Sequence, residues 1–142
     1  MMSTTWHIQP DPTNAELQWA VVGTGPDEAW PYFFSGFRLQ TYPRLMEAAA
    51  SQTGYDSNGC GFGFPAVIAA LDPQAPPLPP DAVEVYMPGF AESVLPRTTF
   101  YAVLLAFGER LTGHPGQSPA WHAAMQAALN QLRIRIAADA AG

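Results

Sequence analysis

The chain has 142 residues, of which 48% are apolar and 13% are charged, with six arginines, no lysine and a formal net charge of −6. This length and apolar content are typical of one folded domain and exclude a disordered chain. The shortage of basic residues argues against nucleic-acid binding, because phosphate contacts require clustered Lys and Arg.

The sequence also lacks signals for secretion and for a membrane. Cys60 is the single cysteine, so no internal disulfide can form. No stretch reaches the roughly 18 apolar residues of a membrane span, and residues 1–12 lack the pattern of a secretory signal. We therefore expect a cytoplasmic protein without membrane association, folded as one domain over residues 1–142.

The N-terminal part favours strands. Trp6 and Ile8 alternate as in a brief strand, and residues 16–22 alternate more regularly between apolar and polar side chains. Residues 29–39 are rich in aromatic side chains, which are enriched in β-structure. We interpret residues 15–39 as an antiparallel hairpin.

Residues 43–53 predict a helix, because Pro43 suits a first turn and an apolar stripe follows. The next stretch, residues 54–71, holds four glycines and the turn dipeptide Asn58-Gly59. We interpret it as a helix–loop–helix connection, with Gly54 ending the first helix in a left-handed conformation. The glycines either solve a packing problem or form a surface loop that carries binding residues.

Residues 72–81 contain five prolines, which exclude a helix interior or a central strand. We expect a semi-rigid connector there, the alternative being a proline-rich ligand for a recognition domain. Residues 82–87 alternate as a strand with Glu84 and Tyr86 facing outward. Residues 90–95 pair back with that strand.

Two helices complete the chain. The first opens at Pro96 and runs to Leu111 with a one-sided apolar stripe. The second follows Ser118 as N-cap, and we expect residues 137–142 to fray. Strands and helices in this order predict an α+β domain with a mainly antiparallel sheet and about four helices packed on one face.

Catalytic and metal-binding motifs are missing. Cys60 with a histidine could act as nucleophile and base, but the histidines lie far from it in sequence and a structural cysteine is the plainer interpretation. The histidines lack zinc-ligand spacing, and the glycine stretch lacks the lysine of a phosphate loop. We therefore expect no enzyme, no metal and no cofactor.

The stretch GYDSNGCGFGF, with Glu47 ahead of it, resembles a turn found in immunity proteins of bacterial polymorphic toxin and contact-dependent growth inhibition systems. Gly54, Tyr55, Asn58 and Gly59 match that G-Y-x-x-N-G pattern, and the later segment from Val83 to Leu111 is similar to the paired strands and following helix of small immunity proteins. Ser57 and Cys60 depart from the pattern. The resemblance implies a small α+β protein that binds and neutralises a cognate toxin domain, often a basic nuclease.

In that interpretation acidic and aromatic side chains would meet the toxin and occlude it stoichiometrically, with charge setting the encounter rate and a few aromatic anchors the affinity. The candidate contacts are Asp27, Glu28 and Trp30 at the predicted hairpin turn; Tyr55, Asp56 and Asn58 in the glycine stretch; and Glu84, Tyr86 and Glu92 on outward strand faces.

Two other functions fit the same sequence. A small-molecule-binding or minor catalytic domain would use the aromatic segment and the glycine stretch to line a pocket near Cys60. A weak homodimer would bury the exposed aromatic side chains between two copies.

Overall fold

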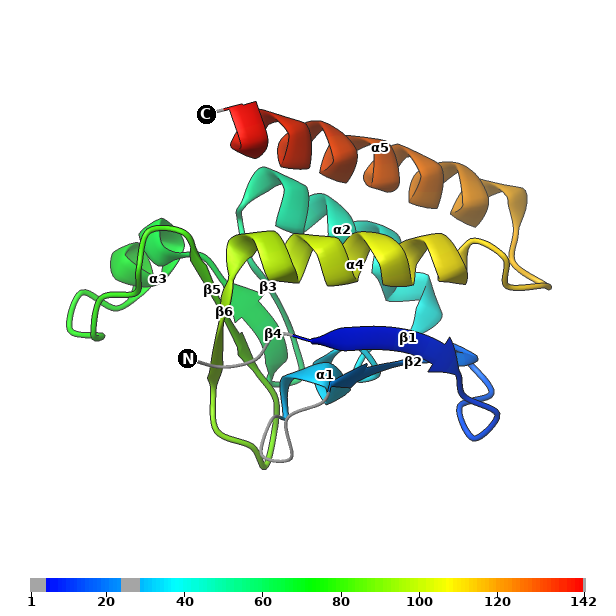
Figure 1. The fold of residues 1–142 in the computed structure, drawn as a ribbon, viewed down its shortest axis with the longest axis horizontal. Helices are drawn as coiled ribbons and strands as arrows, with labels where there is room; N and C mark the ends of the chain where they lie inside the picture. The colour runs from blue at the N-terminus through cyan, green and yellow to red at the C-terminus, as the bar shows by residue number, and fades with distance from the viewer. Residues whose placement is uncertain (1–4, 24–28, 142) are drawn as a thin grey trace.

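The computed structural model describes residues 5–23 and 29–141, and these residues form an α+β fold, as predicted (Figure 1). The elements in chain order are β1 (Trp6–Pro10), β2 (Trp19–Gly23), α1 (Trp30–Phe33), the 3₁₀ turn η1 (Leu39–Thr41), α2 (Tyr42–Ser51), β3 (Tyr55–Ser57), β4 (Cys60–Gly63), α3 (Pro65–Leu71), β5 (Ala82–Tyr86), β6 (Ser93–Pro96), α4 (Arg97–Leu111) and α5 (Pro119–Ala141).

The elements stack in layers. Helix α5 lies over α2 and α4, and these two helices lie over the strands (Figure 1). An added Cβ at Gly108 of α4 would stand 2.7 Å from Met46 Cε of α2 and 3.1 Å from Leu129 Cδ2 of α5. A glycine in α4 therefore permits the close approach of α2 and α5.

The N-terminal hairpin differs from the prediction for residues 15–39. Strand β2 pairs antiparallel with β1, from Trp6 opposite Gly23 to Pro10 opposite Trp19, and residues 30–33 form a helix. The reason is the spacing of the aromatic residues in this segment. Those at positions 30, 33, 34 and 37 are all buried, and that spacing gives one helical face rather than the alternation of a strand. Aromatic content alone is a weak guide to β-structure because burial decides it.

The two helices of the predicted helix–loop–helix connection are present as α2 and α3, but the glycine-rich segment between them is a β-hairpin and not a loop. Strands β3 and β4 pair around Asn58 and Gly59, whose φ angles are 55° and 82°. Positive φ at both central residues is the geometry of a two-residue hairpin turn. Helix α2 ends at Ser51 with Gln52 as its left-handed C-cap, φ 57°, and Gly54 takes its own left-handed conformation, with φ 82°, outside the helix.

A four-stranded antiparallel sheet in the order β3-β4-β5-β6 carries two different faces. Cross-strand partners share a face. Tyr55, Phe62 and Val85 form one register row, and this inner face packs on the core. The neighbouring row of Asp56, Gly61 and Tyr86 belongs to the opposite, outer face. The outward orientation predicted for Glu84 and Tyr86 is thus confirmed.

The core under the inner face is mainly aromatic. Phe33, Phe62 and Phe100 meet with ring centroids 5.1 to 6.2 Å apart. The predicted stripe of α4 is confirmed, since all its members are fully buried: Phe100, Val103, Leu104, Phe107 and Leu111. Helix α3 contributes no fully buried residue, and Leu71 at its end is 82% exposed.

The C-terminal helix begins as predicted, with Ser118 Oγ accepting a hydrogen bond from Trp121 N at 3.1 Å. It continues through Ala141, so residues 137–141 of the segment predicted to fray are helical in the structure. Asp139 explains this, because its carboxylate pairs with Arg97 Nε of α4 at 3.0 Å. In the described part of the chain, no helix combines the length and apolar character needed to cross a membrane.

Candidate functional site: an acidic sheet face beside an aromatic groove

The predicted contact residues fall into three groups. Asp27 and Glu28 lie outside the described residues. Trp30 is only 1% exposed and packs its ring edge-on against Phe34, so it lies in the core rather than on the surface. Its position on the buried face of the helical segment directs its side chain into the core.

Tyr55 also belongs to the inner face. It is half-buried, and its ring lies 6.1 Å from the ring of Phe37. The remaining predicted residues, listed here, are on the outer face or on the turns that adjoin it: Asp56, Asn58, Glu84, Tyr86 and Glu92.

Asp56 and Tyr86 are linked across the outer face. The Tyr86 hydroxyl donates a hydrogen bond to Asp56 Oδ2 at 2.8 Å, although 30 residues separate the two positions. The other carboxylate oxygen, Oδ1, accepts the Gly59 N–H at 3.3 Å and so braces the hairpin turn. Gly61 stands between them in the register, and the absence of a side chain there lets the tyrosine ring reach over β4 to Asp56.

The outer face concentrates negative charge. Burial, the hydrogen bond to Asp56 and the charges of Asp56 and Glu84 raise the pKa of Tyr86 to about 12. Partial burial and the charge of Glu92 raise the pKa of Glu84 above its ordinary 4.5. Among the described residues, none of these three carboxylates has an ion-pair partner. Within residues 5–23 and 29–141, like charges therefore share this surface without an ion-paired cation.

A groove of about 540 Å³ opens between the β3–β4 turn, the β5–β6 connection and the segment after α1. Two exposed aromatic side chains stand on it: the rings of Tyr32 and Phe90 are stacked with centroids 6.4 Å apart and planes at 20°. The lining residues are Tyr32, Ser35, Gly36, Phe37, Arg38, Thr41, Ser57, Asn58, Cys60, Met87, Pro88 and Phe90.

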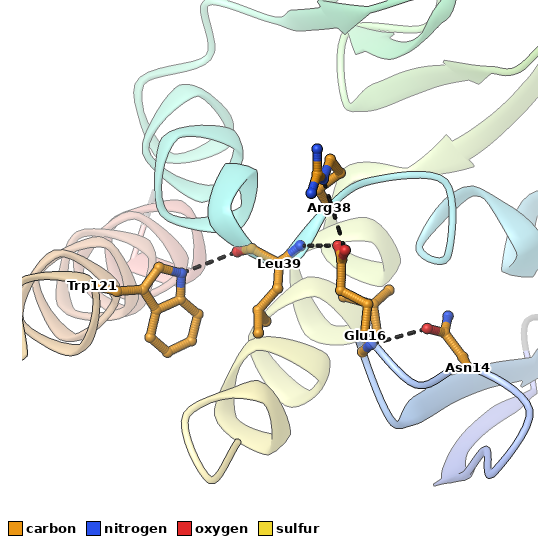
Figure 2. A network of polar contacts seen from close by, with 6 residues as sticks. Asn14, Glu16, Arg38, Leu39 and Trp121 are labelled. Carbon is orange, nitrogen blue, oxygen red and sulfur yellow. Dashed lines mark hydrogen bonds and ion pairs between the residues drawn. The ribbon is translucent and has the colours of Figure 1, made fainter. Parts of the chain in front are cut away.

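A polar network holds the wall of the groove that contains Arg38 (Figure 2). One carboxylate oxygen of Glu16 accepts the Leu39 N–H at 2.7 Å, and the other lies 3.7 Å from Arg38 Nε. The Leu39 carbonyl accepts the indole N–H of Trp121 at 3.0 Å. The network thus ties the segment before β2, the turn η1 and helix α5 together, and it partly balances the charge of Arg38.

Cys60 lies in the groove with 6% of its surface exposed. Burial and then the charge of Asp56 raise the pKa of its thiol. A nucleophilic cysteine needs the opposite shift, because the thiolate is the reactive form. Across residues 5–23 and 29–141, no cluster of three or more His, Cys, Asp or Glu side chains is placed to hold a metal ion.

Sequence reasoning missed the aromatic part of this site, Tyr32 and Phe90. The helical spacing of the buried aromatic residues of this segment would have placed Tyr32 on the outside, but the segment was assigned to a strand. Phe90 was placed in a pairing strand, whereas it lies 53% exposed in the turn region before β6.

Comparison with known proteins returned nothing: no protein-family model, curated protein or solved structure matches this chain.

Proposed function

We propose that this protein binds a basic protein partner through the outer face of its four-stranded sheet and neutralises it by occlusion, as an immunity protein does for its toxin. The observation that carries the proposal is the set of carboxylates around Tyr86, namely Asp56, Glu84 and Glu92, none of which forms an ion pair within the described part of the chain. Like charges held together destabilise the free protein, and the cations of a partner would relieve that repulsion.

The resemblance of the glycine stretch to immunity proteins supplies the class of partner. A basic toxin domain of the nuclease type, met in the cytoplasm, is the partner that fits both the resemblance and the charge of −6. Attraction between opposite charges mainly raises the association rate, and this advantage falls as salt screens it. One protein would block one toxin domain, without catalysis.

The test is co-expression in bacteria with the C-terminal domain of the secreted protein encoded immediately upstream. We expect the wild-type protein to restore growth and to co-purify with that domain. Asp56→Lys and Glu84→Lys should each slow association about tenfold at low salt. Glu47→Lys is the matched control, because it changes the net charge equally at an exposed position of α2.

Persisting toxicity in cells that contain soluble wild-type protein would contradict this function for that pair. If Asp56→Lys and Glu84→Lys both associate with the toxin domain at the wild-type rate, the outer face is not part of the interface.

The groove favours a second candidate function, small-molecule binding. Its volume of about 540 Å³ lies within the usual range of ligand sites, and its lining mixes apolar with a few polar side chains. A small molecule that raises Tm, with an effect that Phe90→Ala abolishes, would favour this function over toxin binding.

A further inference from the structure

The proline-rich connector between α3 and β5 has the burial pattern of a polyproline II helix. Ala75 and Leu78 are half-buried, whereas the prolines around them are exposed: Pro76, Pro77, Pro79 and Pro80. A period of three residues is that of polyproline II, and each proline fixes its own φ and favours extended backbone in the residue before it. One side of this segment faces α3, where Leu78 and Ile68 line the same hollow. The other sides present the four proline rings to solvent, and we call these prolines the proline ridge.

The proline ridge projects from the body of the molecule and is flanked by negative charge. Helix α3 contributes no fully buried residue, and α3 with the connector stands at one side of the fold (Figure 1). Asp72 and Asp81 are exposed at the two ends of the connector, and within the described residues neither carboxylate forms an ion pair. The connector contains no Lys or Arg. The ridge is thus a rigid apolar segment between two exposed carboxylates.

The groove has the complementary shape and chemistry. Rigid polyproline II segments bind in grooves lined by aromatic side chains, and the rings of Tyr32, Phe37 and Phe90 line this one. A polyproline II backbone makes no internal hydrogen bonds, so its carbonyl oxygens can accept from the side-chain amide of Asn58 in the lining. The groove therefore offers both flat apolar rings and a side-chain donor to such a segment.

Arg38 gives the groove its charge, because among the described residues that line it there is this one cation and no carboxylate. Its side chain is 79% exposed, and it approaches Glu16 through Nε at 3.7 Å. Its terminal amino groups form no hydrogen bond or ion pair with the described part of the chain. A guanidinium binds an incoming carboxylate through two parallel hydrogen bonds, and Asp72 and Asp81 beside the ridge are carboxylates of this kind.

We propose that the groove of one copy of this protein binds the proline ridge of a second copy. The two surfaces lie on different parts of the molecule, so the contact joins unlike surfaces and can pass from each copy to the next. The charge of −6 on each copy opposes association, but at 0.15 M salt charges act over only about 8 Å, so the local pairing of Arg38 with a carboxylate beside the ridge counts for more. We expect a Kd on the order of 100 μM, because the ridge is short and small interfaces are transient.

This contact is separate from the proposed toxin interface. Ser57 and Cys60, which line the groove, are register partners in the hairpin and alternate with Asp56, so they lie on the other side of the sheet from it. Self-association through the groove and toxin binding through the outer face can therefore be lost independently.

The experiment measures self-association of the purified full-length protein by sedimentation velocity at 0.15 M salt, from about 10 μM to about 1 mM. Phe90→Ala, and separately the double variant Pro76→Ala with Pro79→Ala, should each weaken association about tenfold. Ile134→Ala and Pro73→Ala are matched controls, because these side chains are also exposed but lie on α5 and outside the ridge, and both should associate like the wild type. A thermal melt of each variant confirms that it is folded.

An equimolar mixture of the two defective proteins gives the sharpest test. The Phe90→Ala chain keeps its ridge and the double proline variant keeps its groove, so the mixture should form pairs with near wild-type affinity although neither protein associates well alone. A mixture that associates no better than its components would overturn the proposal. So would a wild type that stays monomeric at about 1 mM, association that survives the loss of the two prolines, or equal weakening in the two controls.

Discussion

On the outer face, the glycine at position 61 allows Tyr86 and Asp56 to meet. The ring of Tyr86 crosses β4 above Gly61, and its hydroxyl binds the carboxylate on β3 at 2.8 Å. A Cβ at position 61 would overlap the carbonyl oxygen of Tyr55 and would lie 2.8 Å from the Tyr86 hydroxyl and 2.9 Å from Asp56 Cα. Two of these three neighbours are backbone atoms and cannot rotate away.

We expect Gly61→Ala to destabilise the protein by about 3 kcal/mol, at the upper end of what overpacking a well-packed site costs. Gly113→Ala is the control, because its Cβ would meet Arg110 O at an ordinary 3.5 Å. Urea unfolding of the two variants measures the difference. Equal stability of the two would contradict the close approach seen at Gly61.

Glu84 connects the charge of the outer face to stability. Its folded-state pKa is raised, so ionised Glu84 destabilises the native state at pH values above that pKa. Below the ordinary value of 4.5 the side chain is protonated in both states and the cost disappears.

Glu84→Gln should therefore raise Tm at pH 7, and the gain should vanish as the pH falls below about 4.5. Thermal unfolding of the wild type and the variant between pH 3 and 7 measures this gain in Tm. The same variant should bind the proposed partner more slowly, since it removes one negative charge from the face that we propose attracts that partner. A gain in Tm that is the same at pH 3 and pH 7 would show that charge is not its cause.

At the scale of elements, long-range contacts decide where the helices end. Arg135 of α5 donates from Nε to the Ala50 carbonyl near the end of α2 at 2.9 Å. The sequence analysis assigned residues 137–142 to a frayed tail because chain ends usually fray. The Arg97–Asp139 pair, with side chains 25% and 20% exposed, keeps the last turns of α5 on α4 instead.

We expect Asp139→Asn to lower the free energy of unfolding by about 1 kcal/mol, at the high end for an ion pair that is not fully buried. Glu109→Gln is the control. It weakens a pair of 3.9 Å between side chains that are 43% and 52% exposed, and it should change stability by less than about 0.5 kcal/mol. Denaturant unfolding compares them. If Asp139→Asn and Glu109→Gln lower the free energy of unfolding equally, α5 frays at its end, as the sequence alone suggested.

At the scale of the whole molecule, this fold brings together side chains that local patterns keep apart. Asp56 on β3 and Glu84 on β5 face the same way because β4 pairs with both strands. Tyr32 meets Phe90 because α1 sits at the end of the same sheet. The alternation within each strand predicted that the residues of the acidic face point outward. The groove could not be predicted, because the residues that line it come from segments far apart in the sequence.

The sequence by itself determined the elements that have strong, regular patterns. The stripes of α2 and α4, the alternation in β5 and the α+β class followed from periodicity, because a long amphipathic segment has one way to bury its apolar side chains. Only the tertiary structure decided the rest. It made a helix of the aromatic segment, a hairpin of the glycine stretch and an ordered helix of residues 137–141. In short segments local preference is weak, and the core, the strand pairing and one ion pair outweigh it.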